Sequence, residues 1–133
     1  MATLDTAAAL GQAAAGLTYQ SETDAPWEAF AWPTARGTPT GAGVRRLGRH
    51  KADAPAEEQA VEEFFAPLCR DQDWFGDEER AVAAKYRALL DVVKRRLKDP
   101  KVVQGGERQV TVYVVGTASE GGWAGLTTTA VET

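Results

Sequence analysis

The chain has few of the side chains on which enzyme catalysis depends. Its 133 residues include one histidine, His50, and one cysteine, Cys69. A structural zinc site takes four ligands of this kind, so these two residues cannot build one. A serine or cysteine nucleophile would need His50 as its base, and His50 lies in a segment that reads as a basic loop. The sequence therefore predicts neither a zinc centre nor a nucleophile with its base.

No nucleotide-binding glycine motif is present either. Gly116 and Gly121 have the outer spacing of a phosphate-binding loop, but no Lys-Ser or Lys-Thr pair follows Gly121, so we interpret both as turn glycines. The many carboxylates fall on predicted outer helix faces, where solvation explains them. We predict that the protein is not an enzyme and has no intrinsic metal or cofactor. A small-molecule enzyme, the weaker hypothesis, would need a deep pocket lined by convergent polar groups.

The distribution of charge favours a binding function. The formal net charge is -4, and all 15 basic residues lie between residues 36 and 110. Residues 1–35 and 111–133 carry acidic side chains but no lysine or arginine. If the two ends meet in the fold, they form an acidic surface, which repels nucleic acid and attracts a basic partner. The alternative is that short segments lack basic residues by chance.

Two acidic groups are candidates for presentation to such a partner. Glu22 lies in the polar segment 21–24, whose side chains can bond nearby backbone amides, so these residues alone favour a simple turn, and presentation of Glu22 to a partner is the alternative. Thr133 ends the sequence directly after a predicted strand. Because a terminus held by a sheet is better ordered than a loose tail, we expect the carboxylate and hydroxyl of Thr133 to be held at a fixed place.

The element that organises the chain is a long helix predicted over residues 72–100. Its acidic residues gather at the start and its basic residues at the end, as the helix dipole favours. We expect Asp73 or Asp77 to cap it and Asp99-Pro100 to end it. Apolar residues recur at steps of three and four and therefore share one face: Val82, Tyr86, Leu89, Leu90, Val93 and Leu97.

Shorter elements are predicted on either side of this helix. Periodicity and turn signals indicate helices over residues 3–15 and from about Asp53 to Leu68, and strands over 27–32, 44–47, 109–116 and 123–131. The last two strands form a hairpin. The basic residues between 45 and 51 are interpreted as a solvated loop and not as a nucleic-acid site, because no aromatic side chain lies among them.

The strand over 109–116 indicates the fold class. Val110, Val112 and Val114 share one face, whereas Thr111, Tyr113 and Val115 share the other. Both faces are fairly apolar, so we expect helices on both sides of the sheet. The prediction is a single domain over residues 1–133, a three-layer α/β/α sandwich with a small, largely antiparallel sheet and a long helix in the C-terminal half. No membrane span or signal peptide is recognisable, which favours the cytoplasm.

Three separated segments resemble the nuclease A inhibitor family, whose members are small cytoplasmic inhibitors of sugar-nonspecific nucleases. The segments are GLTYQSETDAPWEAFAW (16–32), QDWFGDEERAVAAKYRALLDVVKRRLKDPKV (72–102) and VYVVG with AGLTTTAVET (112–133). The resemblance covers most of the chain and is weakest between Pro33 and Gln59. It implies the same sandwich fold and a binding function without catalysis.

The resemblance also implies a site. In the family inhibitor, a glutamate and the terminal threonine reach the catalytic magnesium of the nuclease, and these positions match Glu22 and Thr133. A glutamine beside a tryptophan lies at the interface and matches Gln72 and Trp74, with Asp73 between them as a weaker candidate. The implied partner is a sugar-nonspecific nuclease, and the magnesium belongs to it. We expect a monomer before complex formation. The alternative is a binding protein of this fold that recognises a different basic or metal-containing protein.

Overall fold

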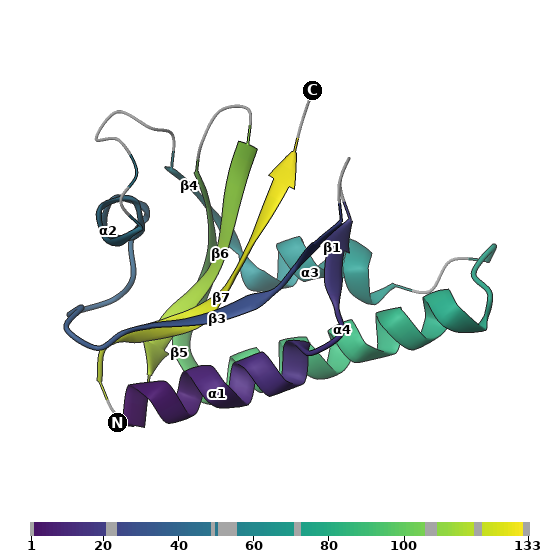
Figure 1. The fold of residues 1–133 in the computed structure, drawn as a ribbon, viewed down its shortest axis with the longest axis horizontal. Coiled ribbons are helices and arrows are strands. Elements are labelled where there is room, and N and C mark those ends of the chain that lie inside the picture. The colour runs from purple at the N-terminus through teal and green to yellow at the C-terminus, as the bar shows by residue number, and fades with distance from the viewer. Residues whose placement is uncertain are drawn as a thin grey trace.

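The computed structural model shows an antiparallel sheet with helices on both faces (Figure 1). The described residues are 2–20, 24–48, 50, 56–70, 73–105, 109–118 and 121–131, excluding the side chains of 2–5, 20, 24, 109, 130 and 131. The sheet has five strands in the order β3 (Glu28–Trp32), β7 (Trp123–Val131), β6 (Gln109–Ala118), β5 (Leu97–Gly105) and β4 (Ala56–Ala60). A separate two-stranded hairpin pairs β1 (Thr18–Gln20) with β2 (Asp24–Pro26).

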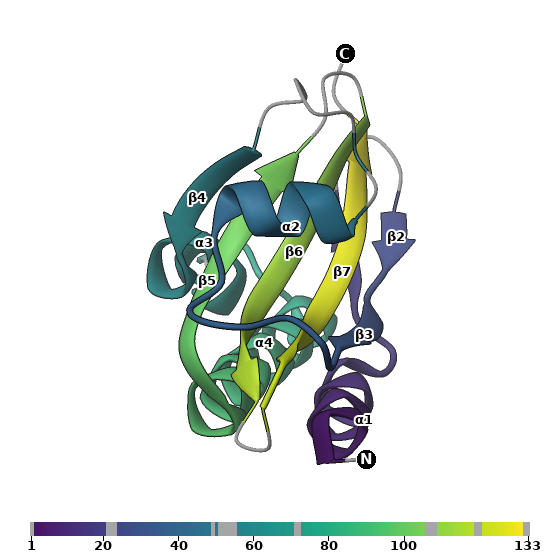
Figure 2. The ribbon, with the colours of Figure 1, turned by 90° about the vertical axis from the view of Figure 1, so that its left-hand side faces the viewer.

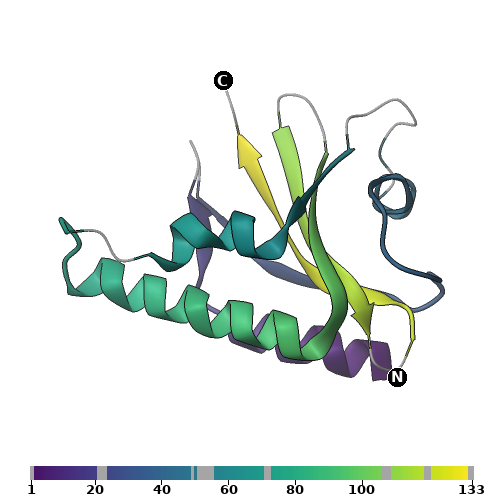
Figure 3. The same ribbon diagram turned by 180° about the vertical axis from the view of Figure 1, so that it is seen from behind.

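The four helices in the described residues form the two outer layers. On one face lie α1 (Ala2–Ala14), α3 (Val61–Cys69) and the long α4 (Asp77–Arg96), which runs beside α3 in Figure 3. The short helix α2 (Gly41–Leu47) crosses the opposite face, as Figure 2 shows. The predicted α/β/α sandwich is therefore confirmed. None of the helices in the described part of the chain is long and apolar enough to cross a bilayer.

Strand β6 divides the core between the two layers, as its alternation predicted. Val112 and Val114 pack with the buried residues of α1, α3 and α4. Tyr113 and Val115 pack on the other face with Val44 of α2. The predicted hairpin is also confirmed, because β6 and β7 pair in antiparallel register from Gln109 with Val131 to Thr117 with Trp123.

The boundaries of α4 differ from those predicted. The helix begins at Asp77, and its cap is Gly76, whose backbone N–H donates to Glu79 Oε2 at 3.0 Å, so neither Asp73 nor Asp77 is the N-cap. It ends at Arg96, because Leu97 turns extended and pairs with Ala118 as the start of β5. Asp99-Pro100 does not end a helix. It forms an irregularity in β5 where Asp99 has a φ of 51°.

The segment between Pro33 and Cys69 holds the other corrections. Residues 44–47 are helical and not a strand, because Thr40 Oγ1 accepts a hydrogen bond from the Gly43 N–H at 3.0 Å and caps α2. The helix predicted from about Asp53 begins at Val61 instead. Residues 56–60 form the edge strand β4, which the sequence pattern does not predict. Asp53 and Pro55 lie outside the described residues.

Candidate functional site

The largest exposed apolar side chains mark one region of the surface. Trp74 is 74% exposed and Val82 is 44% exposed, and the described residues include no other large apolar side chain as exposed as these. Trp74 stands in the connection between α3 and α4, edge-on to Phe75 with ring centroids 4.6 Å apart. Trp74 and Val82 are eight positions apart in the sequence. The path of the chain from the α3–α4 connection into α4 therefore brings them to the same region of the surface.

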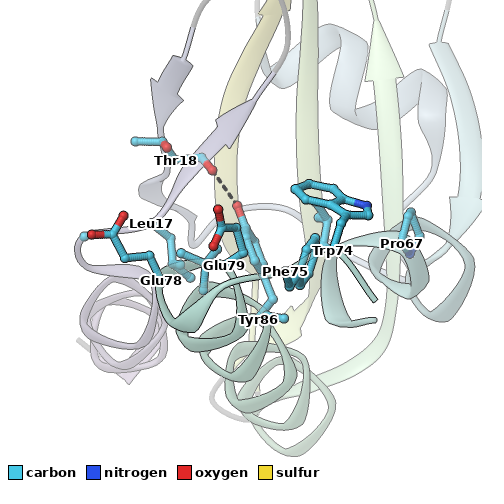
Figure 4. Close-up of a pocket in the computed structure, with 12 residues that line it drawn as sticks. Leu17, Thr18, Pro67, Trp74, Phe75, Glu78, Glu79 and Tyr86 are labelled. Carbon is cyan, nitrogen blue, oxygen red and sulfur yellow. Dashed lines mark hydrogen bonds between the residues drawn. The ribbon is translucent and has the colours of Figure 1, made fainter. Parts of the chain in front are cut away.

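Both residues line one open cavity of about 690 Å³ (Figure 4), which we call the α3–α4 groove. Its walls come from three parts of the chain: residues 16–18 at the end of α1 and the start of β1, residues 67–68 of α3, and residues of the segment 74–86. The charged residues that line it are Glu78 and Glu79. The groove therefore combines an apolar floor with an acidic wall.

Hydrogen bonds hold the walls of the groove in place. The Tyr86 hydroxyl donates to the Thr18 carbonyl at 2.7 Å, a bond drawn in Figure 4, and it accepts from Trp27 Nε1 at 3.1 Å. Burial raises the pKa of Tyr86 above its ordinary value of 10.0, which keeps this hydroxyl protonated. Arg87 Nη1 donates to the Cys69 carbonyl at 2.6 Å and links the end of α3 to α4.

The β1–β2 hairpin stands between the groove and the end of β7. Its first strand contributes Thr18 to the groove. Its second strand is held against β7 by Thr128, whose hydroxyl lies 2.9 Å from the Pro26 carbonyl and 3.3 Å from that of Ala25. Thr128 is three residues before the end of β7 at Val131. Figure 1 shows the tip of β7 and the hairpin at the same end of the sheet.

The two segments that lack lysine and arginine meet in the sheet, which is the condition that the predicted acidic surface depends on. β3 pairs with β7 in antiparallel register from Glu28 with Thr127 to Trp32 with Trp123. The N-terminal and C-terminal segments that lack lysine and arginine are therefore side by side in the sheet. Glu28 is exposed there, whereas the other acidic side chains of these segments are not among those described.

A second, smaller cavity of about 340 Å³ lies beside α2 and is lined by Ala42, Arg45, Arg46 and His50. His50 Nε2 and the Tyr113 hydroxyl are 2.7 Å apart, so the imidazole bonds to a side chain of the sheet. Burial raises the pKa of Tyr113. The basic residues Arg45 and Arg46 therefore belong to the last turn of a helix and not to the solvated loop that we expected.

Comparison with known families decides the identity of the chain. The family model described as nuclease A inhibitor-like protein matches residues 5–133. The chain belongs to this family. The resemblance seen in three segments is thus confirmed over nearly the whole length, including the region between Pro33 and Gln59 where it was weakest. No curated protein matches the chain.

Membership of the nuclease A inhibitor-like family indicates a nuclease inhibitor, and with it a nuclease as the protein partner. Among the described residues, no group of three or more histidine, cysteine, aspartate or glutamate side chains could hold a metal ion. The α3–α4 groove offers apolar and acidic groups for contact with another molecule.

The predicted site residues fall into two groups. Asp73 and Trp74 are described, and both are exposed at the α3–α4 connection beside the groove. Glu22, Gln72 and Thr133 lie outside the described residues, so their roles stay predictions. The described strands β1 and β2 lie at the same end of the sheet as the end of β7, and β2 contacts β7 through Thr128.

The groove could not be predicted from the sequence pattern. The periodicity puts Val82 on the apolar face of the long helix, whereas Val82 is exposed and lines the cavity. Phe75, Glu78 and Glu79 are not among the predicted site residues. A signal for them was present, since Trp74 and Phe75 are two adjacent aromatics inside the otherwise hydrophilic stretch 70–80.

Proposed function

We propose that this protein inhibits a sugar-nonspecific DNA/RNA endonuclease by blocking its metal-containing active site with Glu22 and Thr133. The observation that carries the proposal is the hydrogen bonding of Thr128 to the β2 backbone at Ala25 and Pro26. It holds β2 against β7, and these are described strands that adjoin residues 22 and 133 in the sequence. Two carboxylates on neighbouring supports can enter one active site together.

The chemistry of the partner's site fits this arrangement. A nuclease of this type holds magnesium and basic groups around a phosphodiester. Magnesium prefers hard oxygen ligands and usually keeps several waters, so a carboxylate can replace a substrate oxygen directly or through a water. In this proposal the magnesium belongs to the nuclease, and the inhibitor supplies oxygens but no catalytic group. The acidic ends of the chain would speed encounter with a basic cleft.

Gln72, Asp73 and Trp74 would extend the contact away from the metal. Trp74 presents a large rigid side chain to solvent, and tryptophan is a common hot-spot residue in protein interfaces. We expect a complex of one inhibitor and one nuclease that buries about 1,600 Å² in total. In this proposal the inhibitor is a monomer before it binds, and it acts in the cytoplasm.

A DNA-degradation assay tests the proposal. Purified untagged protein of residues 1–133 is titrated into a magnesium-dependent sugar-nonspecific nuclease at fixed magnesium. We expect a stoichiometric loss of nuclease activity. A Glu22→Ala variant that also lacks Thr133 is expected to lose the inhibition, because it removes both groups that reach the metal.

The matched controls separate the site from general charge effects. Glu57→Ala removes a carboxylate from the exposed edge strand β4 and should inhibit like the wild type. Residues added after Thr133 should weaken inhibition strongly, whereas residues added before Met1 should not. Undiminished inhibition by the C-terminally extended protein would remove Thr133 from the mechanism. A wild-type protein that leaves the nuclease fully active would favour a different basic or metal-containing partner.

A further inference from the structure

We propose that the α3–α4 groove is a separate docking site for a segment of the partner nuclease that presents an apolar side chain flanked by lysine or arginine. This inference rests on the proposed function, because it concerns how the same partner is held. It adds a distinct role: the groove supplies affinity and partner choice, while Glu22 and Thr133 block the metal. The nuclease segment that occupies the groove is thus defined by its side chains, an apolar residue flanked by basic ones, and not only by belonging to a nuclease.

The groove is apolar because exposed and buried apolar side chains surround it. Scattered exposed apolar residues are normal on a protein surface, but a cluster that surrounds a hollow marks an interaction site. Trp74 and Val82, the large apolar side chains most exposed in the described part of the chain, line the same groove. Beneath them Leu17, Ala83 and Tyr86 are buried and close the floor. An apolar side chain inserted there would be covered on several sides.

The acidic residues that line the groove determine which charge the partner should carry next to the inserted apolar side chain. Glu78 and Glu79 line the groove, and no lysine or arginine is among its lining residues. Asp77 directly precedes Glu78 and Arg80 directly follows Glu79, both exposed, so the excess of negative charge comes from the two lining glutamates. Glu78 precedes Val82 by one helical turn, so the two lie on one face of α4. An acidic rim around an apolar hollow complements basic residues beside an apolar one.

The groove is also built to keep its shape. Tyr86 joins its floor to β1 through the bond to Thr18, Glu79 holds the start of α4 through the Gly76 amide, and Arg87 holds the end of α3. A preformed site loses less entropy on binding than one that must order first. Because Thr18 lies in β1, a segment in the groove would lie next to the β1–β2 hairpin.

The test measures binding and inhibition separately. Binding to a catalytically inactive sugar-nonspecific nuclease is measured by calorimetry, and inhibition is measured with the active enzyme. Trp74→Ala, Val82→Lys and Glu78→Lys should each weaken binding by about tenfold or more. Active nuclease should still be fully inhibited when enough of each variant is added. The Glu22→Ala variant lacking Thr133 should still bind through the groove while it fails to inhibit at saturation.

Each charge variant has a control of the same kind. Ala84→Lys adds a positive charge at an exposed position of α4 that does not line the groove, and Glu57→Lys reverses a charge on the far edge strand. Both controls should bind within about twofold of the wild type. Higher salt should weaken the wild type more than Glu78→Gln, since that variant has lost part of the charge attraction. Urea unfolding of every variant verifies that it is folded.

The outcomes distinguish the two proposals. If the wild type binds and inhibits but the groove variants bind as tightly as the controls, the groove proposal is wrong and the proposed function stands. If the wild type neither binds nor inhibits, both fail. If sedimentation shows that the free protein is a dimer that Trp74→Ala dissociates, the groove holds a second copy of this chain and the proposal is overturned.

Discussion

The indole nitrogen of Trp27 lies 3.1 Å from the hydroxyl oxygen of Tyr86, to which it donates a hydrogen bond. The same hydroxyl donates to the Thr18 carbonyl at 2.7 Å. The phenolic oxygen of Tyr86 in α4 therefore accepts from Trp27, which lies between β2 and β3, and donates to Thr18 of β1. Through these two bonds the long helix holds the base of the β1–β2 hairpin and, at the same time, the floor of the α3–α4 groove.

Tyr86→Phe should lower stability because it leaves these two partners without their bond. A buried polar group that loses its partner costs about 1–3 kcal/mol, so we expect the free energy of unfolding to fall by about that amount. Urea denaturation measures it. Inhibition should weaken as well, since the hairpin loses its tie to α4. Tyr113→Phe, which removes a hydroxyl on the opposite face of the sheet, should leave inhibition unchanged. A Tyr86→Phe protein as stable as the wild type would contradict this role.

Alkaline pH should destabilise the protein through its buried tyrosines. Burial raises the pKa of Tyr86 and of Tyr113 above the ordinary value of 10.0. Above about pH 10 the unfolded chain has released these protons while the native state still binds them, so the free energy of unfolding falls as pH rises. The full contribution of these groups is present below pH 10. We expect a flatter alkaline slope in the Tyr86→Phe and Tyr113→Phe double variant, and an unchanged slope would contradict it.

Glu58 should contribute stability at neutral pH that disappears in acid. Hydrogen bonds from Lys101 Nζ at 2.9 Å and from the Gly41 N–H at 2.7 Å lower the pKa of this carboxyl below 4.5. Its contribution is therefore present above pH 4.5 and is lost as pH falls through the lower, native pKa. Because the side chain is 44% exposed, Glu58→Gln should cost at most about 1 kcal/mol at neutral pH.

Unfolding free energies of Glu58→Gln and the wild type, measured from neutral to acid pH, verify this expectation. The two curves should converge in acid. Glu57→Gln, on the same strand and exposed, provides the matched control and should follow the wild type throughout. A constant difference between Glu58→Gln and the wild type at all pH values would mean that the carboxylate charge is not the cause.

Gly43→Ala should destabilise the packing of α2 on the sheet. A Cβ at this position would lie 2.5 Å from Cη2 and 2.9 Å from Cζ3 of Trp123, which is buried beneath the helix. Although alanine favours a helix, the overlap should cost about 1–3 kcal/mol. In a Trp123→Leu background, which removes the large ring, the cost of Gly43→Ala should shrink. The coupling between the two changes, measured by a double-mutant cycle, identifies the contact. Additive effects would show that Trp123 is not the obstacle.

The central elements could be predicted because their residues repeat with the period of their structure. The apolar steps from Tyr86 to Val93 mark a helix face, and the alternation from Val110 to Val115 marks a strand with two covered faces. Both patterns are local consequences of backbone geometry, so they need no knowledge of the rest of the chain. The same reasoning fails at boundaries. Leu97 continues the helical spacing of Val93, but it is the first residue of β5 because it pairs with Ala118.

The elements between Pro33 and Cys69 depend on partners far away in the sequence. The residues of β4 have little strand preference of their own, yet they pair with β5, and Glu58 and Gln59 bond to Lys101 and Gln104. Likewise α2 depends on the hydrogen bond that caps it at Thr40 and on the packing of Gly43 against the ring of Trp123. No periodicity within either segment indicates these contacts. Val82 has the spacing of a core residue, but tertiary packing leaves it exposed at the groove, and helical spacing does not contain that information.

The sequence by itself determined the family, the layered fold and the candidate residues of the site, because these depend on local patterns and on residue identities. Only the tertiary structure decided that the hairpin before β3 lies against β7 and that Trp74, Glu78 and Val82 surround one hollow. These relationships join segments up to about a hundred residues apart in the chain. They arise from sheet pairing and side-chain packing, which fix distances in space that spacing along a sequence does not contain.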